Sequence, residues 1–148
     1  MSITATMDHG SATASTSRNA TQAPATRRGM VLAGRIISGF VALFLLMDAV
    51  LRIARFTPYV DGLVQFGYPA HLAVPIGVSL LVGAVLYVIP RTAVLGAILV
   101  TGYLGGAVAS HVRMEDSFFV TGLVFGVLAW AGLYLREPRL RALLPLRA

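Results

Sequence analysis

Four long apolar runs, joined by short polar links, dominate the pattern of hydrophobic and polar positions along this chain. Three of the runs continue for 19 residues without a charged side chain. A helix rises ~1.5 Å per residue, so such a run reaches about 28 Å, close to the ~30 Å hydrocarbon core of a bilayer. A soluble helix would keep a polar face, which these runs lack. The pattern predicts an all-α integral membrane protein, a four-helix transmembrane bundle with spans at about residues 34–52, 72–90, 92–110 and 117–135.

The link between the first two spans is the longest, and it carries the signals of a short helix. Thr57 followed by Pro58 suits a helix cap and first turn, and Gly67 suits a stop. One face of this helix would hold Tyr59, Leu63 and Phe66. We therefore expect a short interfacial helix that lies on the bilayer surface. Only Pro90 and Arg91 separate the next two spans, which predicts a tight antiparallel hairpin.

Residues 1–28 differ from the rest of the chain and are expected to form a disordered tail. Sixteen of these 28 residues are Ser, Thr or Ala, and without apolar periodicity they have little to bury. A cleaved twin-arginine signal is the alternative, because Arg27 and Arg28 precede an apolar run. Arg35 interrupts that run and no Ala-x-Ala cleavage pattern follows, so we favour a retained first helix. The expected domains are a cytoplasmic tail over residues 1–28 and a membrane domain over residues 29–148.

The composition supports a membrane protein and excludes several kinds of site. Of the 148 residues, 57% are hydrophobic and 12% are charged, whereas a soluble domain carries about 25% charged residues. Without cysteine, the chain can hold no disulfide scaffold, thiolate zinc site or cysteine-ligated iron–sulfur cluster. The sequence also has no nucleotide-binding loop, catalytic-triad order or metal-ligand spacing, so no metal ion is expected.

The charge of the chain indicates its orientation. All 12 basic residues are Arg, and the formal net charge is +6. In so apolar a chain, the expected counter-charge is anionic lipid headgroups rather than nucleic acid. If both termini are cytoplasmic, nine Arg lie on that side and only Arg52, Arg55 and Arg113 lie on the other. This bias follows the positive-inside rule and predicts a multi-pass protein with both termini in the cytoplasm.

Small residues recur at a spacing of four in the third and fourth spans. They are Gly102, Gly105 and Gly106 in the third span and Gly122 and Gly126 in the fourth. Such a spacing lets helix backbones approach closely in a bilayer. The glycines either pack the helices within one bundle, which we favour, or form the face of a homodimer.

Polar residues are expected to gather at the extracytoplasmic end of the bundle. The first and third spans end there and the other two begin there, so the topology brings their polar ends together. The candidate ligand-binding residues are Asp48, Arg52, Tyr68, His71, Tyr103, His111 and Arg113. Asp48 and Arg52 are four residues apart on one helical face, and an unpaired carboxylate within a span costs ~2.5–3.5 kcal/mol. We therefore expect Asp48 to face the interior and to pair first with Arg52.

Three interpretations of this cluster are open. In the first, it binds the head of a lipophilic molecule such as a quinone, because His and Asp exchange protons and Arg holds an anionic oxygen. In the second, Asp48 and Arg52 form a structural pair, while His111 and Arg113 only complement a helix dipole. In the third, His71 and His111 ligate a haem, which requires two imidazoles facing each other across one cavity.

Several segments, in their order and spacing, resemble the DoxX-like membrane proteins of bacteria. They are Phe66-Gly-Tyr-Pro69, Leu86-Tyr-Val-Ile-Pro-Arg-Thr92, the stretch from Leu95 to Ala107, His111-Val-Arg113 and the stretch from Trp130 to Arg136. The resemblance runs from about Gly34 to Leu146 and implies a four-helix protein of the bacterial inner membrane. The family takes its name from a subunit of a quinone-linked thiosulfate-oxidising complex. Similar proteins carry an acid in the first span, here Asp48, and a cation four residues later, usually Lys and here Arg52.

The residues and the resemblance together predict an accessory or quinone-binding component of a membrane redox complex, with a redox protein as its partner. No cofactor is demonstrable from the sequence itself, and a quinone is the candidate. A structural or scaffolding membrane protein without a ligand is the alternative. An autonomous enzyme ranks third, because a chain without cysteine or a cofactor motif would have to borrow its electron carrier.

Overall fold

The computed structural model describes the backbone of residues 12–143 and the side chains of residues 28–140. This part of the chain folds into helices joined by short turns, which confirms the predicted all-α class. The helices are α1 (Ala12–Ile53), α2 (Thr57–Gln65), the short 3-10 helix η1 (Ala70–Leu72), α3 (Ala73–Val88), α4 (Ala93–Arg113), α5 (Phe119–Arg136) and α6 (Pro138–Leu143).

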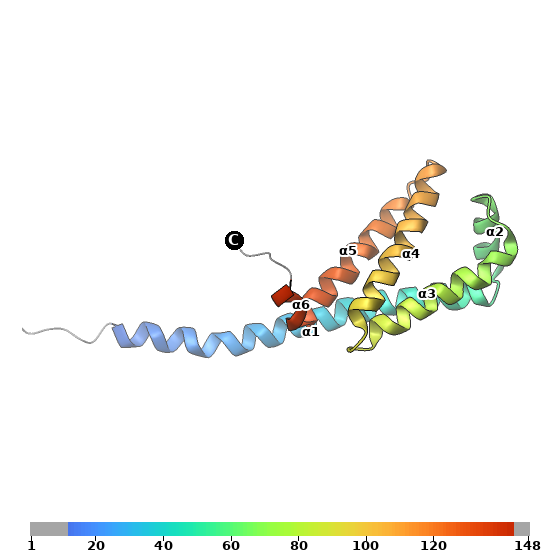
Figure 1. Cartoon of the computed structure of the whole chain (residues 1–148). Helices are drawn as coiled ribbons and strands as arrows, with labels where there is room; N and C mark the ends of the chain where they lie inside the picture. Colours follow the sequence, from blue (N-terminus) through green and yellow to red (C-terminus); the bar gives the residue numbers. More distant parts are fainter. Residues whose placement is uncertain (1–11, 144–148) are drawn as a thin grey trace, which may run out of the picture.

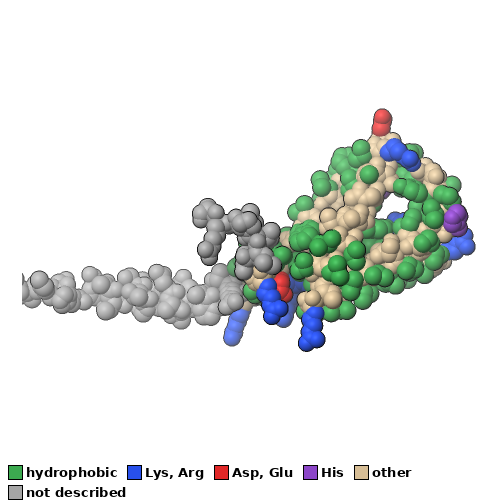
Figure 2. All heavy atoms as spheres, viewed as in Figure 1, with side chains coloured by type: hydrophobic (Ala, Val, Ile, Leu, Met, Phe, Trp, Pro, Cys, Tyr) green, Lys and Arg blue, Asp and Glu red, His purple; other side chains and the backbone are tan. Residues whose placement is uncertain are grey.

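Four helical segments are long and apolar enough to cross a membrane, in agreement with the predicted spans. They are Arg28–Ile53, Ala70–Val88, Ala93–Arg113 and Phe119–Arg136. Large apolar side chains project from their outer surfaces, with Leu43 70% and Val127 62% exposed. In Figure 2 this apolar surface covers the middle of the molecule, and the charged side chains in view lie toward its ends. Such a surface belongs in a lipid bilayer, because contact with water would be unfavourable over its whole area.

Helix α1 begins at Ala12, inside the segment expected to be a disordered tail. Its first part projects beyond the other helices (Figure 1). Most helical stability in proteins comes from packing, which such a projection does not receive from the bundle. The expected disorder of residues 1–11 concerns residues outside the described ones. A separate tail over residues 1–28 therefore stays a prediction.

The four long helices form a bundle in which each packs against two others. Helix α1 packs against α3 and α5, and α4 packs against the same two helices. Helices α1 and α4 therefore lie diagonally across the bundle. The short helix α2 lies between the first two spans, as the sequence predicts, with Pro58 in its first turn. The expectation that Thr57 caps this helix is wrong: the N-cap is Phe56, no side chain makes a cap hydrogen bond, and Thr57 is the first helical residue.

Contacts around Tyr87 close the bundle at the end that holds the α3–α4 link. The buried Tyr87 hydroxyl donates to the carbonyl oxygen of Ala129 at 2.9 Å and lies 3.1 Å from Ser38 Oγ. Arg136 Nη2 donates to the Tyr87 carbonyl oxygen at 2.6 Å, and the Arg136 guanidinium lies over the Tyr87 ring. A single tyrosine thus ties α3 to both α1 and α5.

Two glycines let backbones meet at this closed end. A Cβ on Gly96 would overlap the backbone of Leu86 and Tyr87, so α4 begins in direct contact with the last turn of α3. A Cβ on Gly132 would lie 2.6 Å from Ser38 Oγ, where α5 passes α1. Neither glycine is among the five that the sequence pattern singles out for packing.

We predict that Gly96→Ala destabilises the protein by ~1–3 kcal/mol or more, because the new methyl group meets backbone that cannot rotate away. Gly39→Ala is the matched control, since it also lies within a helix but has no atom within 4 Å of its Cβ position. The control should be neutral or more stable by up to ~1 kcal/mol. Thermal unfolding in detergent measures both variants, and equal melting temperatures would contradict the close α3–α4 approach.

Candidate functional site

A cavity of about 340 Å³ opens toward the other end of the bundle, between α2, α3, α4 and the end of α1. In Figure 1, α3 and α4 diverge from their shared link. In Figure 2, seen from the same side, the surface is hollowed in the region where these two helices diverge. The cavity is lined by Arg52, Leu63, Phe66, Tyr68, Ile76, Ser79, Gly102, Tyr103, Gly106, Ala107, Ser110 and His111. It therefore combines apolar walls with a small set of hydrogen-bonding side chains.

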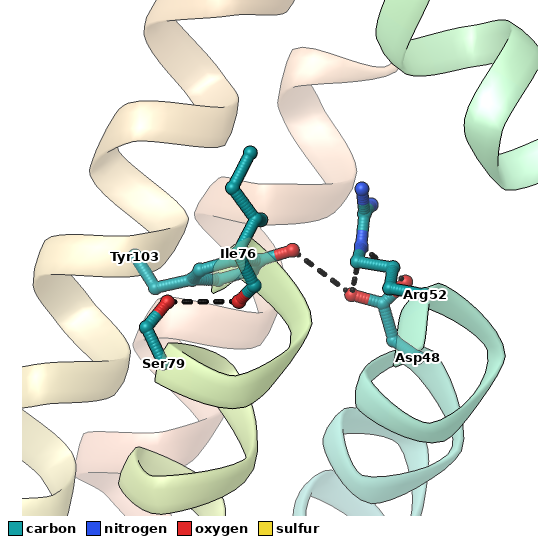
Figure 3. A network of polar contacts seen from close by, with 5 residues as sticks. All are labelled: Asp48, Arg52, Ile76, Ser79 and Tyr103. Carbon is teal, nitrogen blue, oxygen red and sulfur yellow. Dashed lines mark hydrogen bonds and ion pairs between the residues drawn. The ribbon is translucent and has the colours of Figure 1, made fainter. Parts of the chain in front are cut away.

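The carboxylate of Asp48, on α1, is held from two helices (Figure 3). Arg52 Nε lies 3.2 Å from both carboxylate oxygens, one turn further along α1. The Tyr103 hydroxyl donates to Asp48 Oδ2 at 3.1 Å, and it reaches there from α4, across the diagonal of the bundle. Only 13% of the Asp48 side chain is exposed. The buried charge is thus both paired and hydrogen-bonded, as burial within a span requires.

Three contacts hold the segment from α2 to η1 against the end of α4. Arg113 Nη2 donates to the carbonyl oxygen of Phe66. The Phe66 ring meets the His111 ring edge-on, with 4.7 Å between the ring centroids. The hydroxyls of Tyr68 and Ser110 are hydrogen-bonded at 3.2 Å. The segment is thereby fixed as one wall of the cavity.

The turn from α4 to α5 is built around Asp116, which lies outside the spans. The Phe118 N–H donates to Asp116 Oδ1 at 3.1 Å, and His111 Nδ1 lies 3.0 Å from Asp116 Oδ2. The backbone hydrogen bond first, and the contact with His111 second, lower the pKa of Asp116. The same contact holds the His111 ring where it lines the cavity.

The structure places the seven candidate residues in three different positions. Four of them line the cavity: Arg52, Tyr68, Tyr103 and His111. Asp48 lies behind two of these and binds both, and Arg113 holds Phe66 at the wall. His71 is exposed on η1 and is not among the cavity-lining residues. Because His71 and His111 do not face each other across this cavity, the haem interpretation lacks the geometry it requires.

The five glycines of the third and fourth spans occupy different surroundings. Gly102 and Gly106 line the cavity, and a Cβ on either would meet nothing within 4 Å. Gly105 has the same open space and lines a second, apolar groove of about 590 Å³ on α4 and α5. Gly122 and Gly126 face α4, with their Cβ positions 2.8 Å and 3.9 Å from its side chains. Gly102, Gly105 and Gly106 thus border open space rather than a neighbouring helix, unlike Gly96 at the start of the same helix.

Sequence reasoning misses Phe66 and Ser110 as parts of the site. Phe66 is assigned to the face of a surface helix, and Ser110 to the end of an uncharged run. One signal was available, because Gly102, Gly106 and Ser110 follow one another at a spacing of four on α4. Residues at that spacing share a helical face, so three small residues indicate a face with room beside it.

Comparison with known protein families bears out the resemblance seen in the sequence. The model of the DoxX-like family matches residues 36–132, from α1 into α5. The match covers about two thirds of the chain and includes Asp48, Arg52, Tyr103 and His111. No curated protein and no solved structure matches the chain.

We predict that acid weakens the α4–α5 turn through Asp116. Because its pKa is lowered in the folded protein, Asp116 stabilises the fold above the unfolded value of about 3.9. That contribution is lost as the pH falls through the folded-state pKa. Melting temperatures measured from about pH 6 to about pH 3 should therefore fall more steeply for the wild type than for Asp116→Asn. Glu115→Gln is the control and should follow the wild type, and an equally steep fall in Asp116→Asn would refute this role.

Proposed function

The chain belongs to the DoxX-like family, and we propose that it binds the polar head of a lipophilic molecule, with a quinone as the candidate. In this proposal the protein is an accessory component that holds the lipophile for a redox partner in the same membrane. The supporting observation is the cavity of about 340 Å³, which gathers hydrogen-bonding side chains inside an apolar bundle. Binding sites for small molecules have this character, with volumes from about 300 Å³.

The walls of the cavity suit a molecule with an apolar body and a polar head. Leu63 and Ile76 supply aliphatic surface, and Phe66 supplies an aromatic ring. The guanidinium of Arg52 and the hydroxyl of Ser110 supply polar contacts on the same cavity. A head group that leaves the lipid for this cavity therefore finds hydrogen-bond partners without entering water.

Binding is a better-supported role for this chain than an autonomous redox reaction. The sequence has no cysteine and no recognisable cofactor motif, which supports a partner protein as the source of any electron carrier other than the bound lipophile. A scaffolding protein without a ligand is the other candidate function. The binding experiment below separates the two, because a scaffold has no use for the cavity.

We place the protein in the bacterial inner membrane with both termini in the cytoplasm and the cavity toward the opposite side. The end of the bundle that holds the α3–α4 link carries five Arg among the described residues: Arg28 and Arg35 on α1, Arg91 in the link, Arg136 at the end of α5 and Arg139 on α6. The cavity end carries fewer cations, and there Arg52 is already paired with Asp48. The positive-inside rule supports this orientation.

Thiol labelling tests the proposed orientation, because the chain has no cysteine and an introduced cysteine would be its only reactive thiol. Ser117→Cys, in the α4–α5 turn, should react with a membrane-impermeant maleimide in intact spheroplasts. Arg91→Cys, in the α3–α4 link, should react only after the membrane is permeabilised. Both positions are exposed, so reactivity reports the side of the membrane. The opposite pattern would invert the proposed orientation.

We predict that the purified protein binds 2-decyl-1,4-benzoquinone and that Gly106→Leu weakens this binding at least tenfold, or about 1.4 kcal/mol. The leucine side chain would occupy open space in the cavity, so the fold should persist while the ligand is excluded. Gly39→Leu is the control, because its Cβ position is equally open but it does not line the cavity. Calorimetric titration in detergent measures both variants. Equal weakening in the control would place the site elsewhere, and no binding by the wild type would leave the scaffolding role.

A further inference from the structure

Arg52 uses only one of its three nitrogen atoms within the described part of the protein. Its Nε lies 3.2 Å from both oxygens of Asp48, and no described residue accepts a hydrogen bond from Nη1 or Nη2. Figure 3 shows these two nitrogens on the far side of the guanidinium from Asp48. The Arg52 side chain is 22% exposed and lines the cavity. Arginine thus keeps an unused two-pronged donor in this position.

The unused donor lies at the cavity. Arg52 lines it together with Ile76 and Tyr103, and the Tyr59 ring lies 5.4 Å from Arg52 Cζ as a cation–π partner. These neighbours are mostly apolar, and the Tyr103 hydroxyl is already committed to Asp48. Donors in such surroundings gain strongly from an acceptor, because few other groups can satisfy them.

The charges around Arg52 favour a neutral acceptor over an anionic one. The positive charge of Arg52 is compensated by Asp48 at hydrogen-bond distance. The other basic side chain of the lining, His111, has Asp116 as its partner. An anionic head would therefore bring an uncompensated charge into a span, which is unfavourable. A carbonyl oxygen accepts the same hydrogen bonds without that charge.

We infer that Arg52 selects lipophiles whose heads carry neutral, hydrogen-bond-accepting carbonyl oxygens, an inference that rests on the proposed function. The two prongs of the guanidinium donate to the oxygen, and Asp48 holds the guanidinium in place through Nε. The α4 wall leaves room for a ring, because Gly102 and Gly106 present no side chain to the cavity. Arg52 is therefore a specificity-determining residue, and Asp48 is the residue that positions it.

The test compares three probes that share a decyl tail and a six-membered ring: 2-decyl-1,4-benzoquinone, 4-decylbenzoate and decylbenzene. We expect the wild type to bind the quinone most tightly in a detergent titration. Arg52→Lys keeps a cation beside Asp48 but lacks the two-pronged donor. It should weaken quinone binding about tenfold or more, the usual effect of losing hydrogen bonds from a charged donor, and leave decylbenzene unchanged. Arg55→Lys, outside the cavity lining, is the matched control and should bind like the wild type.

A second variant guards against a folding defect in the first. The double substitution Asp48→Asn with Arg52→Gln removes both charges together and retains an acceptor for Tyr103, and it should lose quinone binding to the same extent. If 1,2-didecanoylglycerol displaces the quinone from the wild type, and Arg52→Lys weakens its binding to the same extent, the result would support the inference. It would also identify an ester carbonyl as the oxygen that accepts from Arg52.

Two results would overturn the inference while leaving the proposed function in place. In the first, Gly106→Leu weakens quinone binding, whereas Arg52→Lys and the double variant bind the quinone as tightly as the wild type does. The second is tighter binding of 4-decylbenzoate than of the quinone, which would assign the site to anions. If the wild type binds none of the probes, the proposed function fails and the inference fails with it.

Discussion

A carboxylate inside a membrane span is the constraint on which the rest of this structure depends. Alone in the hydrocarbon core, Asp48 would cost ~2.5–3.5 kcal/mol, and among the described side chains of its own helix it bonds only to the Nε of Arg52. The second donor, the hydroxyl of Tyr103, comes from α4 across the diagonal of the bundle. That hydrogen bond limits how far α4 can move away from α1. It therefore holds Tyr103 beside Arg52 (Figure 3), and both side chains line the cavity.

The cavity exists because α3 and α4 touch at one end of the bundle and diverge toward the other. Helices α1 and α3 stay closely packed at the cavity end, where the Cβ position of Gly77 lies 2.9 Å from Arg52 Cβ. Near the α3–α4 link, the backbones touch at Gly96, and Tyr87 is enclosed by hydrogen bonds and the Arg136 guanidinium. Further along, α3 and α4 diverge (Figure 1), and the contact between them gives way to the bare faces of Gly102 and Gly106. The α2–η1 segment, tied to the end of α4, walls the space that results. The same pair of helices, α3 and α4, is thus closely packed at one end and borders the cavity at the other.

The sequence predicts the spans well because hydropathy and length are local properties, and lipid leaves the helix little alternative. The pair of Asp48 and Arg52 also follows from local spacing, and topology alone brings Tyr103 and His111 toward the same end. The position of His71 depends on how the chain turns through η1, and the hydrophobic periodicity of the sequence does not predict that turn. The role of glycine is equally hidden, because the spacing of Gly102 and Gly106 is the same whether a helix or a cavity lies beside them. Only the crossing geometry of α3 and α4 decides between these.

The identity of the cation beside Asp48 separates a structural pair from a binding site. To neutralise one buried carboxylate, a single cationic nitrogen suffices, and Lys would supply it at the same spacing. Arg52 supplies that contact through Nε and retains two amino groups that no described residue uses. Holding unused donors next to apolar side chains is unfavourable for a group that serves stability alone. The same donors are useful when an acceptor arrives from the lipid, because Asp48 and the Tyr59 ring have already oriented them. The arrangement therefore supports the proposal that Arg52 receives an acceptor in addition to neutralising the carboxylate.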